Sequence, residues 1–305
     1  MTVASRHFLT LPDLDREELL GLIRRARQLK QDMQQGIFKP TLQGRVLAMI
    51  FEKSSTRTRV SFETAIAHLG GHAIFLSPND TQLGRGEPLE DTARVLSKMV
   101  DCVMIRTFEH EKMVRFASCS DVPVINGLSD SFHPCQVLAD MQTWFELRGD
   151  IQGKKVAWLG DGNNVCQTYI QAARIFGFSL VIACPESHRP DTHVVQGSAG
   201  HVEITADPRI AARNADLIVT DVWASMGQEQ EIEARAKIFS PYQVNASIMS
   251  LAATDALFMH CLPAHRGDEV TSEVLDGSQS VVWEEAGNRL HSQKALLELL
   301  LGAGR

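Results

Sequence analysis

Hydroxyl side chains and an arginine stand together in residues 54–58, which read Ser-Ser-Thr-Arg-Thr and directly follow an apolar, partly β-branched run at 46–51. The run predicts a buried strand, and apolar residues after the segment recur at helical spacing. The first N–H groups of a helix lack partners within it and carry the positive end of its dipole. With the hydroxyls and Arg57 they suit an anion such as phosphate. An N-capping cluster with solvated basic residues is the alternative, and this segment alone does not decide.

Polar side chains also follow later strands of the first half. Arg106 stands at the carboxyl end of a buried-type strand at 102–105, and His133 and Gln136 flank Pro134 where a helix opens. Ligands of open α/β sheets bind at the carboxyl ends of strands, so these residues are candidates for the same anion site. A lone histidine beside proline is equally well explained as part of a helix N-terminus.

The second half places a different set of groups at its strand ends: Asn164, Asp221, Ser225 and Cys261. The first set is cationic and suits a phosphate. The second set offers a carboxylate, an amide and a hydroxyl, which suit the α-ammonium and α-carboxylate of an amino acid. We expect a cleft between two domains to bring the sets together.

Residues 160–165, Gly-Asp-Gly-Asn-Asn-Val, follow a predicted strand at 156–159 and partly match a dinucleotide-binding fingerprint. The third glycine is missing, and Cys184-Pro185 follows the next strand where an acidic residue would bind ribose. The pattern therefore disfavours NAD binding and, with it, an oxidoreductase.

The composition limits the function classes. The chain has 305 residues, 44% hydrophobic and 22% charged, with a formal net charge of −7. This length suits two domains, and the acidic balance argues against a general nucleic-acid or membrane surface. Against that background the local basic cluster of Lys53, Arg57 and Arg59 stands out. Six scattered cysteines without a CxxC pair predict neither zinc site nor disulfide framework and fit the cytoplasm. We expect no signal peptide and no membrane span.

Strands and helices alternate in two series, separated by a polar, glycine-containing break at 149–154. The alternation predicts an α/β fold of two domains, each a parallel sheet flanked by helices, with the active site in the interdomain cleft. We expect the domains at 1–148 and 149–288. The second domain should include a strand at 280–283. A last helix at 290–301 follows, and residues 289–305 should pack back on the first domain.

Four motifs together resemble the ornithine branch of the carbamoyltransferase family. They are Ser55-Thr56-Arg57-Thr58, His133-Pro134-Cys135-Gln136, Asp221 with Ser225-Met226-Gly227, and His260-Cys261-Leu262-Pro263. The likeness extends nearly from end to end, in the order and spacing of that family. It implies a homotrimer or a multiple of trimers, in which the loop 77–88 with Gln82 serves a neighbouring site.

The resemblance implies that the side-chain amine of L-ornithine attacks carbamoyl phosphate and gives L-citrulline and phosphate, in arginine biosynthesis. By the same resemblance the carbamoyl-phosphate site comprises Ser55, Thr56, Arg57, Thr58, Gln82, Arg106, His133, Pro134, Cys135, Gln136, Cys261, Leu262 and Arg289. The ornithine site comprises Asn164, Asp221, Ser225 and Met226. The residues implied in the chemistry itself are Thr58, Arg106, His133 and Cys261. No metal and no organic cofactor is implied.

Cys261 as a covalent nucleophile would need a nearby base and a lowered pKa. Direct attack by the amine explains the chemistry without that, so we expect Cys261 to bind and orient, and His260 to be structural.

Two other functions remain open. One is a carbamoyltransferase for aspartate, putrescine or an acylated ornithine. Asp221 argues against aspartate, whose second carboxylate it would repel, and the Ser225-Met226-Gly227 loop argues against putrescine, which has no α-carboxylate. The other is a non-catalytic binding protein for carbamoyl phosphate or an amino acid, for which so complete a set of donors would be unnecessary.

Overall fold

The computed structural model describes residues 5–77, 86–224 and 231–302. The chain divides into two compact units. The first comprises Met1–Gln142 with Asn288–Arg305, and the second comprises Thr143–Gly287. Each is described by itself below.

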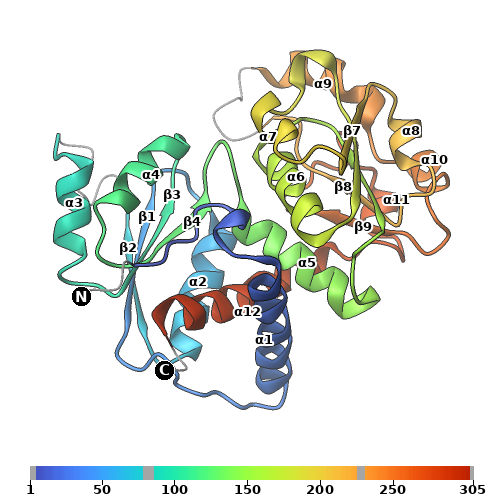
Figure 1. The fold of residues 1–305 in the computed structure, drawn as a ribbon. Coiled ribbons are helices and arrows are strands. Elements are labelled where there is room, and N and C mark those ends of the chain that lie inside the picture. Colours follow the sequence, from blue (N-terminus) through green and yellow to red (C-terminus); the bar gives the residue numbers. More distant parts are fainter. Residues whose placement is uncertain (1–4, 78–85, 225–230, 303–305) are drawn as a thin grey trace. The chain divides into compact units, whose positions relative to one another are not determined.

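The first unit is built on a four-stranded parallel sheet with the order β2-β1-β3-β4 (Figure 1). Its strands are β1 (Val46–Phe51), β2 (His72–Leu76), β3 (Cys102–Arg106) and β4 (Val124–Leu128). Its helices are α1 (Arg16–Gln34), α2 (Thr56–His68), α3 (Leu89–Leu96), α4 (His110–Ser118), most of α5 (Pro134–Arg148) and most of α12 (Val282–Leu301), with a 3-10 turn η1 (Leu11–Asp13). The predicted parallel sheet flanked by helices is confirmed.

The core of this unit lies between the sheet and α3 and α4. Ala48 and Ile50 of β1 pack in one buried cluster with Phe116 of α4 and Ala93 of α3. Because successive side chains of a strand point to opposite faces, Leu47 and Met49 face the other side, and both are fully buried as well. Burial on both faces explains why these strands are continuous apolar runs in the sequence.

The last helix, α12, contacts α1 through polar bonds. Arg25 of α1 makes two hydrogen bonds to the carboxylate of Glu298, at 2.6 and 2.9 Å, and Lys30 donates to the side-chain oxygen of Asn288 at 2.8 Å. The strand predicted over 280–283 is wrong: Ser280 forms only an isolated bridge, and α12 already begins at Val282. Asn288 and Arg289 therefore lie inside a helix.

The second unit is a five-stranded parallel sheet with the order β7-β6-β5-β8-β9. Its strands are β5 (Lys155–Leu159), β6 (Ser179–Ala183), β7 (Val202–Thr205), β8 (Leu217–Thr220) and β9 (Leu257–His260). Its helices are α6 (Asn164–Phe176), α7 (Thr192–Gln196), α8 (Pro208–Ala212), α9 (Ile232–Phe239), α10 (Ala246–Met249) and α11 (Ser272–Leu275), with 3-10 turns η3 (Glu186–His188) and η5 (Ser240–Tyr242).

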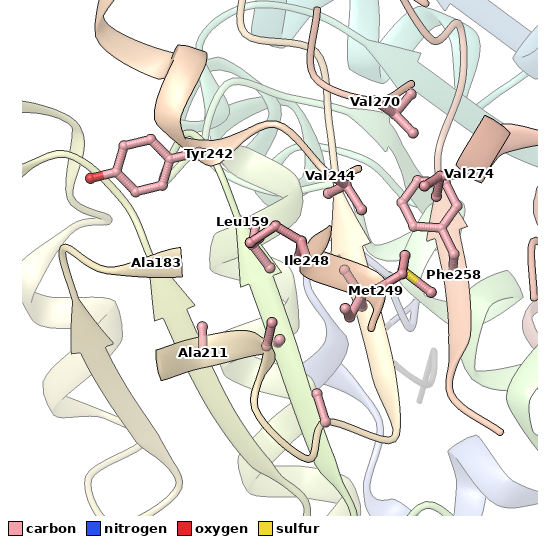
Figure 2. Packing of buried hydrophobic residues seen from close by; sticks show 14 of the residues in the cluster. Leu159, Ala183, Ala211, Tyr242, Val244, Ile248, Met249, Phe258, Val270 and Val274 are labelled. Carbon is pink, nitrogen blue, oxygen red and sulfur yellow. The ribbon is translucent and has the colours of Figure 1, made fainter. Parts of the chain in front are cut away.

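Figure 2 shows the hydrophobic cluster on one side of this sheet, where Leu159 of β5 and Phe258 of β9 meet Ile248 and Met249 of α10. Val270, just before α11, and Val274, within α11, belong to the same cluster. In register, Thr220 lies opposite both Leu159 and His260, so the residues that follow these strands emerge at one edge.

Each sheet has a point at which the chain order reverses direction, between β1 and β3 in the first and between β5 and β8 in the second. Such points leave a crevice at the carboxyl ends of the strands where ligands bind. Among the described residues, no helix is both long and apolar enough to cross a membrane.

Candidate functional site

The first set of predicted residues begins at the N-terminus of α2, which follows β1 directly. Ser55 caps this helix, because its Oγ accepts a hydrogen bond from the N–H of Thr58 at 3.2 Å and its hydroxyl also lies 3.1 Å from Thr58 Oγ1. Arg289 of α12 donates from Nη2 to the same Thr58 Oγ1 at 2.7 Å. The structure thus joins the first turn of α2 to a residue far along the chain.

The charges of three arginines act on the imidazole of His133. The side chain is 3% exposed, and burial together with positive charge holds its pKa well below the usual value. The charges belong, in order of effect, to Arg289, Arg106 and Arg57. Arg57 has a buried Nε atom with no hydrogen-bond partner among the described residues. The site therefore combines three guanidinium groups, a neutral imidazole and a helix N-terminus, an arrangement that attracts a multiply charged anion.

The lowered pKa of His133 predicts a pH effect on stability. In the unfolded chain the imidazole takes up a proton below about pH 6.5, whereas in the folded protein it stays neutral. Acidification below pH 6.5 therefore favours unfolding, by up to about 1.4 kcal/mol per pH unit. We expect His133→Gln to reduce the loss of unfolding free energy between pH 6.5 and 5.5, as measured by urea denaturation. The exposed His193, changed to Gln, serves as control and should keep the wild-type slope; equal slopes for wild type and His133→Gln would contradict the prediction.

The other members of the 133–136 segment have different surroundings. Pro134 is the first residue of α5. The thiol of Cys135 donates to the carbonyl of Asn126 at 3.3 Å, and burial raises its pKa to about 12. Gln136 is fully buried and donates from Nε2 to Asp140 at 2.9 Å. These bonds fix the orientation of the segment, and Cys135 has no reactive thiolate.

Two basic residues of the cluster noted in the sequence have partners elsewhere. Lys53 is buried, forms an ion pair with Asp130 at 2.5 Å and lies 4.2 Å from the ring centroid of Phe108. Arg59 pairs with Glu63 four residues along α2, at 2.9 Å. Of the three, Arg57 alone is among the charges that act on His133.

The second set of predicted residues centres on Asp221, which follows β8. Its Oδ2 accepts a hydrogen bond from Asn163 Nδ2 at 2.7 Å, and its Oδ1 accepts from the thiol of Cys261 at 2.9 Å. Asp221 is 7% exposed and Cys261 is half-buried. Because the amide of Asn163 and the thiol of Cys261 are neutral donors, they hold this carboxylate without an ion pair, and it can bind a cation such as an ammonium group.

Asn164, which we had predicted for this site, is the first residue of α6, and its neighbour Asn163 is the N-cap. Asn163 Oδ1 accepts hydrogen bonds from the N–H groups of Val165 and Cys166, which leaves Nδ2 to bind Asp221. Sequence reasoning missed the role of Asn163. The signal was available, since asparagine immediately before a helix is a preferred capping residue.

Asp221, His260 and Cys261 bring potential metal-ligand atoms within 4.8 Å of one another. Both ring nitrogens of His260 are already engaged, however. Nδ1 accepts from the N–H of Leu262 at 2.9 Å, and Nε2 lies 2.9 Å from Glu269 Oε1. Two ligands then remain, fewer than the three or four protein ligands of zinc sites, so the group fits substrate binding better than a metal.

Gln82, Ser225 and Met226, all predicted site residues, lie outside the described residues.

The segments on either side of 225–230 are joined by Arg235 of α9. Its guanidinium donates to the carbonyl of Trp223 and to the carboxylate of Asp161. This ion pair was also missed from the sequence, because its two residues lie far apart in the chain.

Comparison with known proteins gives matches over both units. Residues 6–146 match the family profile described as "Aspartate/ornithine carbamoyltransferase, carbamoyl-P binding domain", and residues 152–300 match the one described as "Aspartate/ornithine carbamoyltransferase, Asp/Orn binding domain".

Individual relatives match almost the whole chain. A protein of Nitrosococcus oceani named ornithine carbamoyltransferase is 63% identical over 298 residues, 98% of each chain. A protein of Pseudomonas aeruginosa named anabolic ornithine carbamoyltransferase is 59% identical and covers 97% of each chain. Among solved structures, the ornithine carbamoyltransferase of Pyrococcus furiosus is 50% identical with a TM-score of 0.93 over 99% of each chain. That of Burkholderia thailandensis is 52% identical, with a TM-score of 0.91 over 97% of this chain and 98% of that one.

Proposed function

This chain belongs to the aspartate/ornithine carbamoyltransferase family, and from that premise we propose how its residues carry out the reaction. The protein is an ornithine carbamoyltransferase, which transfers the carbamoyl group of carbamoyl phosphate to the side-chain amine of L-ornithine and yields L-citrulline and phosphate, in arginine biosynthesis. The observation that carries the choice of amine is the carboxylate of Asp221, held by Asn163 and Cys261.

Carbamoyl phosphate binds, in our proposal, at the residues around His133. The N–H groups and hydroxyls of Ser55, Thr56 and Thr58 at the start of α2 bind the phosphate. Arg57 and Arg106 contribute charge-assisted hydrogen bonds. Arg289 supports the cluster through its bond to Thr58 Oγ1. Gln136 holds the carbamoyl amide, with Pro134 and Cys135 setting its position on α5 and Gln82 joining from its loop.

The carbonyl oxygen of the carbamoyl group gains negative charge as the amine attacks. Thr58, Arg106 and His133 are the proposed donors to this oxygen. The lowered pKa of His133 supports this role, because a neutral imidazole can donate one N–H without adding a fourth positive charge. Donors positioned in advance for a developing charge typically contribute about 3 kcal/mol each.

Ornithine binds at the carboxyl edge of the second sheet. Asp221 and Asn164 hold its α-ammonium and α-carboxylate together with Ser225 and Met226. Cys261 and the carbonyl of Leu262 orient the side-chain amine. A free alkylammonium has a pKa of about 10.4, so the side-chain ammonium of ornithine must lose a proton before the amine attacks. The attack forms the C–N bond and gives a tetrahedral intermediate. This intermediate passes a second amine proton to the departing phosphate, and the C–O bond to phosphate breaks as the carbonyl double bond re-forms.

The assay that tests this function compares four amines at pH 8: L-ornithine, L-aspartate, putrescine and N-acetylornithine, each with carbamoyl phosphate. We expect a carbamoylated product with ornithine alone. The carboxylate of Asp221 disfavours aspartate, and a site built for both α-groups disfavours putrescine and the acylated amine. Turnover of another amine would contradict the ornithine assignments around Asp221 and leave those around His133 intact. Carbamoyl-phosphate binding without turnover of any amine would favour a binding protein.

In this proposal residues 1–148 bind carbamoyl phosphate, residues 149–288 bind ornithine, and residues 289–305 support the carbamoyl-phosphate site. We also propose a homotrimer or a multiple of trimers in which Gln82 serves a neighbouring subunit, which sedimentation of the full chain would test. A cytoplasmic location is supported by the six cysteines, all within the described residues and none in a disulfide.

A further inference from the structure

Two fully buried ionisable side chains, His260 and Glu269, form a pair behind Cys261. Both are 0% exposed, and His260 Nε2 lies 2.9 Å from Glu269 Oε1. The same carboxylate oxygen accepts a hydrogen bond from the N–H of His265 at 2.6 Å. Buried ionisable groups destabilise a fold unless they have hydrogen-bond or ion-pair partners. A buried pair at this position therefore suggests a role beyond packing.

The backbone decides which nitrogen of His260 carries the proton. The N–H of Leu262 points at Nδ1 at 2.9 Å, and an amide N–H can only donate. Nδ1 is therefore the acceptor, and the imidazole proton sits on Nε2, where it is donated to Glu269. The carboxylate of Glu269 fixes this tautomer, as carboxylates do for other functional histidines.

The bond to Nδ1 holds an unusual piece of backbone. Leu262 has a φ of 56°, in the left-handed region that branched residues rarely occupy. Cys261 lies between the anchored His260 and this residue. On its other side the N–H of His260 donates to Glu285 Oε2 at 2.9 Å, and Glu285 is 1% exposed. The segment is thus held from both ends.

We infer that His260 and Glu269 are positioning residues that hold the Cys261–Leu262 segment in the geometry that receives the attacking amine. Glu269 fixes the tautomer of His260, His260 holds the amide of Leu262, and Leu262 in turn sets the direction of its own carbonyl and of the Cys261 thiol, which bonds to Asp221 at 2.9 Å. Neither residue touches substrate. The inference rests on the proposed function in one respect, that the amine bound there is that of ornithine.

Two substitutions at position 260 separate positioning from simple packing. Asparagine places an amide oxygen near the position of Nδ1 and can still accept from Leu262, but it does not reach Glu269. Glutamine reaches Glu269 with a donor and no longer offers an acceptor to Leu262. Packing alone predicts that His260→Gln is the better enzyme, because it keeps the buried carboxylate paired. Positioning predicts the opposite order of activity.

We expect His260→Gln to lower kcat/KM for ornithine about 100-fold and His260→Asn about 10-fold or less, with the dissociation constant of carbamoyl phosphate unchanged within twofold in both. The order of thermal stability should be the opposite of the order of activity. His260→Asn should be the less stable variant, because asparagine does not reach Glu269. A chemical readout accompanies activity: the alkylation rate of Cys261 by iodoacetamide, measured in a Cys119→Ser background because Cys119 is the other half-buried thiol. That rate should change at least about fivefold in His260→Gln and stay near wild type in His260→Asn.

If the histidine variants fail to fold, Glu269→Gln and Glu269→Met carry the test. Glutamine can keep its oxygen at the position that accepts from His260 and His265, so Glu269→Gln should stay within a few-fold of wild type, whereas Glu269→Met should behave as His260→Gln does. The exposed Asp276, paired with Arg266 on the same segment, gives a control variant, Asp276→Asn, with wild-type values throughout.

Equal activity and equal Cys261 alkylation in His260→Gln and wild type would overturn the inference, as would a large loss in Glu269→Gln with unchanged alkylation. Failure of the proposed function is distinguishable. In that case wild-type enzyme makes no product from ornithine, while the contrast in Cys261 alkylation between the variants still reports on the segment.

Discussion

An Arg106→Gln enzyme should lose about a thousandfold in kcat, or about 4 kcal/mol of transition-state stabilisation. Arg106 ends β3 and is 8% exposed, and its charge is one of those that lower the pKa of His133. In the proposed mechanism the guanidinium N–H groups of Arg106 donate both to the phosphate and to the carbamoyl oxygen, and this oxygen gains negative charge in the transition state. Glutamine keeps a polar side chain of similar reach but removes the charge and the guanidinium fork, which a single amide does not replace.

Rapid-quench measurement of citrulline formation at saturating substrates would test this, together with urea denaturation to show that the fold survives. Arg115→Gln is the matched control. It removes the same charge from the same unit, but Arg115 lies exposed on α4 and pairs with Glu90. Surface pairs of this type contribute little, so we expect wild-type turnover. Near-normal kcat in Arg106→Gln would refute the mechanism proposed for the carbamoyl oxygen.

An Asp221→Asn enzyme should bind ornithine about 100-fold more weakly, because the α-ammonium loses its charged partner in a site that is largely shielded from water. Carbamoyl phosphate binding should be unchanged. Asparagine can keep an oxygen toward Asn163 Nδ2, so the local fold should persist, while the contact with the Cys261 thiol is altered. The KM for ornithine and the dissociation constant of carbamoyl phosphate, measured separately, distinguish the two sites.

Asp255→Asn provides the comparison for this second variant. Asp255 has a side chain 78% exposed and is 4.0 Å from Arg148, and its neutralisation should leave both constants unchanged. An Asp221→Asn enzyme with a wild-type KM for ornithine would show that Asp221 does not bind the amino acid. A parallel loss of carbamoyl phosphate affinity would point instead to a general distortion.

The fold was largely predictable because the central strands of both sheets, such as β1, β3, β5 and β8, are almost completely buried and therefore appear as apolar runs in the sequence. The error at 280–283 has a physical cause. Val281 and Val282 are β-branched and favour a strand, and Gly287 suggests a break, but packing against α1 through Asn288 and Glu298 stabilises one long helix. Tertiary contacts of this kind override local propensity, and no short window of sequence contains them.

The site was predictable where a motif coincides with a strand end, as at Arg57, Arg106 and Asp221. The hydrogen bonds and ion pairs that support the site were not predictable, because they join residues that are far apart in the sequence. The pair of Glu269 with His260 and that of Arg235 with Asp161 connect separate segments of the chain. Lys53 illustrates the converse: it stands beside the anion-binding segment in sequence, yet its charge is directed to Asp130.

The hydrogen bond from Arg289 to Thr58 also has a consequence for the order in which the protein is made. The strands of the first unit and the hydroxyls of α2 leave the ribosome early, but the arginine that joins them is synthesised only after the whole of the second unit. In a nascent chain the anion site therefore stays incomplete until the second unit has been synthesised. A chain that terminates before residue 289 keeps the motif at 55–58 without the arginine that supports it, so activity reports on completed synthesis.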